Sequence, residues 1–129
     1  MSITVGLKGK ATTTTSDANS AKTAGSGVLD VFATPSMVAL MEQAAWTSIA
    51  PFLGEEESSV GTALNISHSS ATPLGLEVWA ESEVTEVDGK RIEFTLTAYD
   101  SKGEIGKGTH QRFIVNVPKF MSKTTGKLS

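Results

Sequence analysis

Glu42 is the residue of this sequence that most needs a chemical explanation, because it is the only charged residue between positions 31 and 54. A carboxylate at the edge of an apolar helix face can reach past the core to solvent or pair with a basic residue. It can instead line a partly buried pocket, where desolvation raises a carboxyl pKa toward the range useful to a general base. The residues around Glu42 leave both explanations open.

Two further side chains could act with it. His68, in the stretch NISHSSATP, has the parity of the apolar residues in a predicted strand, so its imidazole should face the helix. It is then either a core residue satisfied by neighbouring serines or a general base. Thr34 precedes Pro35 and is expected to be the N-cap of the helix. Its hydroxyl could alternatively orient a water, a carbonyl or a carboxylate at the positive end of that helix.

The stretch GEIGKGTHQR, residues 103–112, is the fourth candidate. Three glycines in one strand indicate a bulge or the close approach of another backbone. His110 and Arg112 should share one face of this strand. They could be exposed polar residues of an irregular strand, or they could flank a strip that receives a phosphate or pantetheine arm. The stretch lacks the Lys-Ser/Thr pair and the following helix of a P-loop.

Hydrophobic periodicity predicts the elements that position these residues. Residues 3–15 are rich in β-branched side chains and predict a strand, and the small, polar residues 16–27 predict a loop. Residues 35–52 predict the one long helix. Its apolar stripe consists of Met37, Leu40, Met41, Ala44, Ala45, Ser48, Ile49 and Phe52.

Four strands should follow the helix, because the apolar period changes to two. The first strand is expected to present on one face Val60, Thr62, Leu64, Ile66 and His68. Residues 76–85 and 91–98 predict two more, joined by a hairpin turn at Asp88-Gly89, and the last strand should end at Pro118. Short connections imply an antiparallel sheet, and the helix must cover its apolar face. We therefore expect an α+β fold in which a roughly five-stranded antiparallel sheet wraps a long helix.

Composition limits the classes of function. The 129 residues are expected to form one domain, residues 1–129. A net charge of −3 without a basic cluster argues against nucleic acid and anionic membranes as partners. The absence of cysteine and of zinc-binding histidine spacing argues against a metal site. No secretory signal or membrane-spanning run is evident, so a cytoplasmic protein is expected.

Three segments together resemble one protein family. VFATPSMVALME, GTALNISHSSATPLG and GEIGKGTHQR, in this order and spacing, resemble the hot-dog thioesterases related to fluoroacetyl-CoA thioesterase, over about residues 31–119. The resemblance implies a long helix wrapped by an antiparallel sheet and a homodimer with active sites near the subunit interface. It also implies hydrolysis of an acyl-CoA thioester. Coenzyme A would enter as part of the substrate, and no separate cofactor is expected.

The resemblance also assigns roles to residues. The catalytic positions would be Thr34 of the A-T motif, Glu42 of the M-E motif and His68. The substrate-binding positions would be Gly61, Arg112 and, in the same T-H-x-R motif, His110. In this interpretation the lone carboxylate is a base on the helix that faces the histidine.

One departure from the family bears on the substrate. Where the family carries phenylalanines before its helix, this sequence has Gly25 and Val28, so we expect a broader acyl-CoA thioesterase for short or small acyl groups. Two alternatives stay open. One is an acyl-CoA hydratase or dehydratase on the same fold, and the other is an acyl-CoA-binding module without catalysis.

Overall fold

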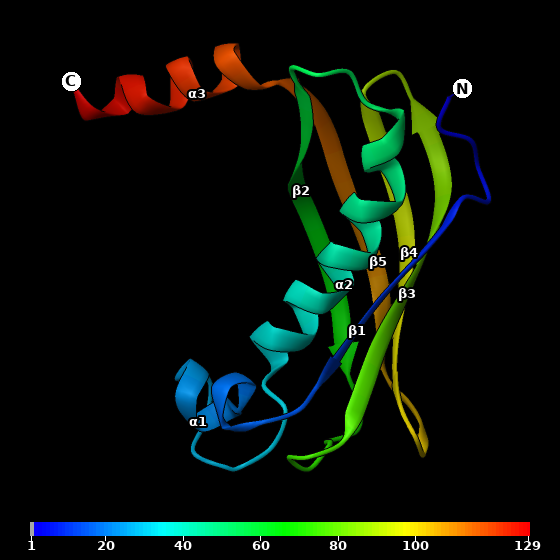
Figure 1. Ribbon diagram of the computed structural model, residues 1–129, viewed down its shortest axis with the longest axis vertical. Helices are drawn as coiled ribbons and strands as arrows, with labels where there is room; N and C mark the ends of the chain where they lie inside the picture. Colours follow the sequence, from blue (N-terminus) through cyan, green and yellow to red (C-terminus); the bar gives the residue numbers. More distant parts are fainter. Residues whose placement is uncertain (1) are drawn as a thin grey trace.

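The computed structural model describes residues 2–129 and consists of one antiparallel sheet that curves around a long helix (Figure 1). The strands are β1 (Lys8–Thr14), β2 (Glu57–His68), β3 (Glu77–Asp88), β4 (Arg91–Asp100) and β5 (Gly103–Asn116). They are ordered β1-β3-β4-β5-β2, and every neighbouring pair is antiparallel. The long helix is α2 (Thr34–Ile49), followed by a 3₁₀ turn at Ala50–Phe52. The predicted α+β architecture is confirmed.

The core lies between α2 and the inner faces of β3 and β4. The buried residues of α2 are Met37, Leu40, Met41, Ala44, Ala45 and Ile49, as the apolar stripe predicted. They belong to the same cluster as the alternate inward residues of the two strands, which are Val78, Ala80, Val84, Ile92, Phe94, Leu96 and Ala98. Ser48 and Phe52, at the end of the predicted stripe, are only half-buried. This packing fixes the direction in which the remaining side chains of α2 point.

β2 is an edge strand with a β-bulge that the sequence pattern did not reveal. The register with β5 shifts between Gly61 and Ala63, so Thr62 is an extra residue. A bulge reverses the alternation of side chains along a strand. The residues that pair with the inward-facing positions of β5 are Gly61, Leu64, Ile66 and His68. The expectation that Val60 and Thr62 share this face is therefore wrong, because both precede the change of phase.

The N-terminal segment differs from its prediction in two ways. β1 begins at Lys8 rather than at residue 3, after a turn at Gly6 with φ of 95°. Residues 16–27 are not a plain loop. They form a 3₁₀ turn at Asp17–Asn19 and the short helix α1 (Ala21–Ala24), each with a serine that caps its first turn.

The C-terminus forms a helix that was not predicted. β5 ends at Asn116, whose side chain accepts a hydrogen bond from the Lys119 N–H at 3.1 Å and caps α3 (Val117–Thr125). Pro118 lies in the first turn of this helix, where proline is tolerated, and does not itself end the strand. All residues of α3 are exposed, and the helix projects past β2 away from the rest of the fold (Figure 1).

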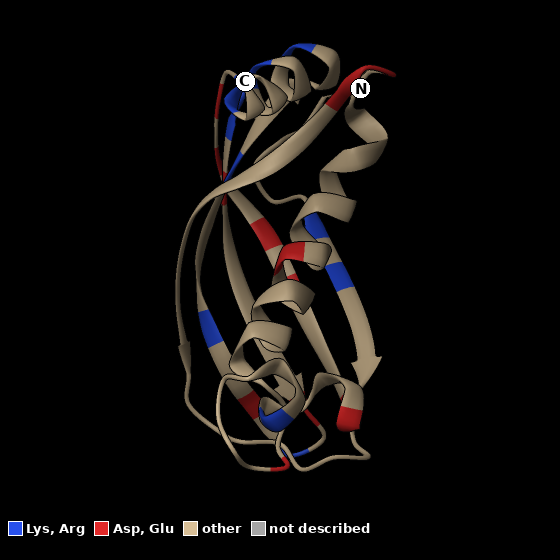
Figure 2. Ribbon diagram, turned by 90° about the vertical axis from the view of Figure 1, so that its left-hand side faces the viewer, with Lys and Arg blue, Asp and Glu red and all other residues tan. Residues whose placement is uncertain are grey.

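Lys and Arg lie on the strands, on α1 and on α3, with Asp and Glu among them (Figure 2). Within residues 2–129, no helix is long and apolar enough to cross a membrane. The same part of the chain has no group of three His, Cys, Asp or Glu side chains that could hold a metal ion.

Candidate active site

The start of α2 and the end of β2 bring Thr34 and His68 together. Thr34 Oγ1 lies 2.7 Å from His68 Nδ1. Thr34 is the first helical residue and not the N-cap, which is Ala33; the Ala33 carbonyl accepts from the Met37 N–H at 2.9 Å. The N-cap prediction is therefore wrong, because the hydroxyl is directed to the imidazole and not to a helix amide. We call Thr34 and His68 the dyad.

The surroundings of His68 favour its neutral form. Burial lowers the pKa of His68, and the backbone of Ser70 opposes this shift in part. Its Nε2 atom is buried and has no hydrogen-bond partner within residues 2–129. A buried nitrogen without a partner is costly, so this atom is suited to a partner supplied by a ligand or a second chain. The dyad lines a cavity of about 240 Å³, whose other walls include Phe32, Ser69 and Ser70.

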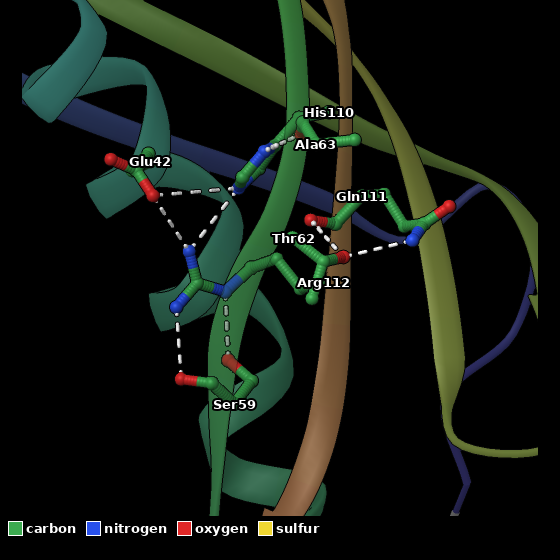
Figure 3. A network of polar contacts seen from close by, with 7 residues as sticks. All are labelled: Glu42, Ser59, Thr62, Ala63, His110, Gln111 and Arg112. Carbon is green, nitrogen blue, oxygen red and sulfur yellow. Dashed lines mark hydrogen bonds and ion pairs between the residues drawn. The ribbon is translucent and has the colours of Figure 1, made fainter. Parts of the chain in front are cut away.

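Glu42 belongs to a second cluster, shown in Figure 3. Arg112 Nη1 donates to Glu42 Oε2 at 3.2 Å, and His110 Nε2 lies 3.9 Å from the same oxygen. The side chain of Glu42 remains 38% exposed. Glu42 does not contact His68 in this chain. It lies eight residues after Thr34 on the same helix, which is about 12 Å along the axis. Within one chain, the carboxylate faces Arg112 and His110 and not His68.

Arg112 is held rigidly in this cluster. Its Nε donates to Ser59 Oγ at 2.8 Å, and its Nη2 donates to the Ser59 carbonyl oxygen at 2.9 Å. The residue is 6% exposed, and burial lowers its pKa while Glu42 opposes the change. Sequence reasoning missed Ser59, and a serine in an edge strand carries no pattern that distinguishes it from a solvated one.

His110 is a neutral imidazole whose two nitrogens are both engaged. Arg112 can only donate, so His110 Nε2 accepts from Nη1 at 3.2 Å. The proton is then on Nδ1, which donates to the Ala63 carbonyl oxygen at 2.9 Å. Burial lowers the pKa of His110, in agreement with this state. His110 therefore orients Arg112 and the bulged strand.

Gly61 leaves space for the carboxylate. A Cβ at this position would lie 2.7 Å from Glu42 Oε2 and 3.2 Å from His110 Cε1. Glu42, Gly61 and His110 line a cavity of about 260 Å³ together with Val38. The glycines of β5 have a different explanation. A Cβ at Gly106 would lie 2.6 Å from the Ser67 carbonyl oxygen, so this glycine permits the close approach of β2.

Comparison with known proteins decides the family. The profile of the family described as fluoroacetyl-CoA-specific thioesterase matches residues 15–118. The chain belongs to this family.

Similar proteins agree with that assignment. A fluoroacetyl-CoA thioesterase from Streptantibioticus cattleyicolor is 43% identical over 98 residues, which cover 76% of this chain and 70% of that protein. A solved threonine-to-serine variant of a fluoroacetyl-CoA thioesterase in complex with acetyl-CoA has a TM-score of 0.93 and 32% identity, and the match covers 98% of this chain and 100% of that one. A thioesterase superfamily member from Thermus thermophilus has a TM-score of 0.87 and 27% identity, covering 95% and 90%.

As a member of the fluoroacetyl-CoA-specific thioesterase family, the chain is a thioester hydrolase with the hot-dog fold. The segment before α2 has Gly25 and Val28 in place of the larger side chains expected for the family. Gly25 ends α1 with φ of 73°, and Val28 is 83% exposed. Neither residue places a large apolar side chain over the dyad.

Proposed function

We propose that the chain hydrolyses a short acyl-CoA to the free acid and coenzyme A as a cytoplasmic homodimer, with no separate cofactor. Each active site would combine the dyad of one subunit with Glu42 of the other. The main support for this proposal is the distance between the dyad and Glu42 within one chain. Thr34 and His68 form one ordered pair, Glu42 and Arg112 form another, and a helix of fixed rise keeps them about 12 Å apart in one chain.

The exposed surfaces support pairing between two copies. β2 has twelve residues, none of them buried, and one of its edges is unpaired in the sheet. A long, open edge is a template for another strand. The outward face of the first two turns of α2 is also mainly apolar, with exposed Pro35 and Ala39. Antiparallel pairing of two β2 strands about a two-fold axis would bring the His68 end of one strand toward the opposite end of the other. The dyad of one subunit would then approach the carboxylate of the other.

The chemistry follows from these groups. The thioester carbonyl would lie at the N-terminus of α2, where first-turn amides without a side-chain cap and the Thr34 hydroxyl stabilise the developing oxyanion. Glu42 either attacks the carbonyl carbon, giving a mixed anhydride that water hydrolyses, or removes a proton from the attacking water. The C–S bond breaks as the tetrahedral intermediate collapses. The coenzyme A thiolate leaves, and His68 passes to it the proton that the attacking water loses.

Thiol release from a panel of acetyl- to decanoyl-CoA tests the activity. Glu42→Gln should lower turnover by about 10²–10⁴. The matched control is Glu104→Gln, which changes an exposed glutamate at the start of β5 and should have the wild-type rate. Wild-type turnover in Glu42→Gln would rule out the role of the carboxylate. If no thioester releases thiol, the protein is a binding module; if a crotonyl thioester changes absorbance without thiol release, it is a hydratase.

Mixed dimers test the sharing of the site. Glu42→Gln and His68→Asn subunits, co-expressed with different affinity tags, give heterodimers in which one composite site keeps both its carboxylate and its dyad. A random mixture should recover about one quarter of wild-type turnover, because half of the dimers are mixed and each has one intact site. If each subunit carried its own complete site, every site in the mixture would be damaged and no activity would return.

A further inference from the structure

The ridge of α2 that carries Glu42 continues into a second cavity. Val38, Glu42, Trp46 and Ala50 follow at four-residue spacing, so they are neighbours along one face of the helix. The first two line the cavity of about 260 Å³ beside Gly61, whereas Trp46 and Ala50 line a cavity of about 370 Å³. Arg112 lines the larger cavity and donates to Glu42, so it stands at the junction of the two.

The larger cavity combines an apolar wall with an arginine whose charge is already compensated. Trp46 and Leu53 supply large apolar surfaces, and the tryptophan is 44% exposed. Arg112 has four of its five N–H donors directed to Glu42, His110 and Ser59. Glu57 adds a carboxylate to the lining. A negatively charged acyl group would therefore be repelled by Glu57 and would find Arg112 already engaged. A neutral apolar acyl group would instead cover the indole of Trp46.

We propose that this cavity holds the acyl chain of the substrate and that Trp46 determines specificity for neutral acyl groups longer than acetyl. The inference rests on the proposed thioesterase function, in which the thioester carbonyl lies beside Glu42. One helical turn further, about 6 Å along the ridge, a chain of several carbons contacts the indole of Trp46. Each methylene that the cavity buries should raise kcat/KM by about fourfold until the cavity is filled.

A chain-length series tests the specificity. The rates of thiol release from acetyl-, butyryl-, hexanoyl- and octanoyl-CoA are compared for the wild type, Trp46→Ala and Trp46→Phe. The chain has two tryptophans, and Trp79 on β3 stacks against Tyr99 at 5.7 Å, so Trp79→Phe is a matched control. Trp46→Ala should lower the hexanoyl-to-acetyl ratio of kcat/KM by about tenfold or more, with Trp46→Phe in between and Trp79→Phe unchanged. Succinyl-CoA should be slower than butyryl-CoA, which has the same number of carbons.

Fluorescence gives a readout that does not depend on hydrolysis. In the Trp79→Phe protein, Trp46 is the only indole, so its emission should change on titration with S-hexyl-CoA, a thioether that cannot be hydrolysed, and much less with S-methyl-CoA. A wild-type chain-length ratio in folded Trp46→Ala, or an indole that does not respond to S-hexyl-CoA, overturns the assignment of the cavity. An indole that responds in a protein that hydrolyses no thioester would support the chain-binding cavity and overturn the hydrolase proposal alone.

Discussion

Gly61→Ala is the most direct test of the cluster around Glu42, because it adds one methyl group at a defined place. The new Cβ would lie 2.7 Å from Glu42 Oε2, so the carboxylate must retreat by about 0.7 Å to reach an ordinary contact of 3.4 Å. Glu42 can move because its side chain is flexible, but Arg112 and His110 hold it from the other side. A misplacement of about 1 Å can lower a rate by about 10²-fold, so we expect kcat/KM to fall by about 10- to 100-fold.

Folding should hardly change, which makes the result interpretable. Alanine restricts the unfolded chain and gains up to about 1 kcal/mol in a strand, and this gain offsets the cost of moving the half-buried carboxylate of Glu42. The matched control is Gly126→Ala, where an added Cβ meets no atom within 4 Å. The assay is thiol release together with chemical denaturation. A folded Gly61→Ala protein with wild-type kcat/KM would refute the argument that Glu42 acts from the position seen here.

Three further predictions concern the dyad and the cluster around Arg112. Thr34→Val should lower kcat by about 10- to 100-fold and leave the fold intact, since it keeps the shape but removes the hydroxyl bonded to His68; an unchanged kcat would exclude the hydroxyl from catalysis. Burial lowers the pKa of His68 and His110 from the usual 6.5, so the neutral imidazoles contribute stability that is complete above pH 6.5 and is lost as the pH falls below it. Tm should therefore drop in mild acid, and His110→Gln should make Tm depend less steeply on pH. Arg112→Lys should destabilise by about 1–3 kcal/mol in urea denaturation, because lysine leaves the acceptors of Ser59 without their donors; a stability like that of the wild type would contradict the rigid placement of the guanidinium.

The sequence predicted the elements well where burial decides the pattern. α2 and the inward residues of β3 and β4 follow periods of 3.6 and 2 because one side of each element is packed against the core. The same reasoning failed for β2, whose residues are all exposed or half-buried. There the bulge at Thr62 changes the phase of the strand, and the identity of a threonine gives no sign of it.

Local signals were ambiguous at the ends of α2 and β5. Threonine before proline favours a cap, yet the Thr34 hydroxyl is bonded to an imidazole that the chain brings from 34 residues away. Pro118 was interpreted as the end of a strand, although proline is equally suited to the first turn of a helix, which it occupies in α3. The role of such a residue depends on partners that are distant in sequence, and local propensities carry no information about those partners.

The site residues show the limit of pairing side chains by type alone. A base on the helix and a histidine on the strand suggested a contact, but within one chain Thr34 is bonded to His68 and Glu42 to Arg112. Eight residues turn the side-chain direction by about 80° and advance it by about 12 Å. Under the proposed function, Thr34 of one copy and Glu42 of the other act on one carbonyl. The proposed function thus makes activity depend on the pairing of two chains. Two features of the single chain support that proposal: the Nε2 of His68 has no partner within residues 2–129, and one edge of β2 is open.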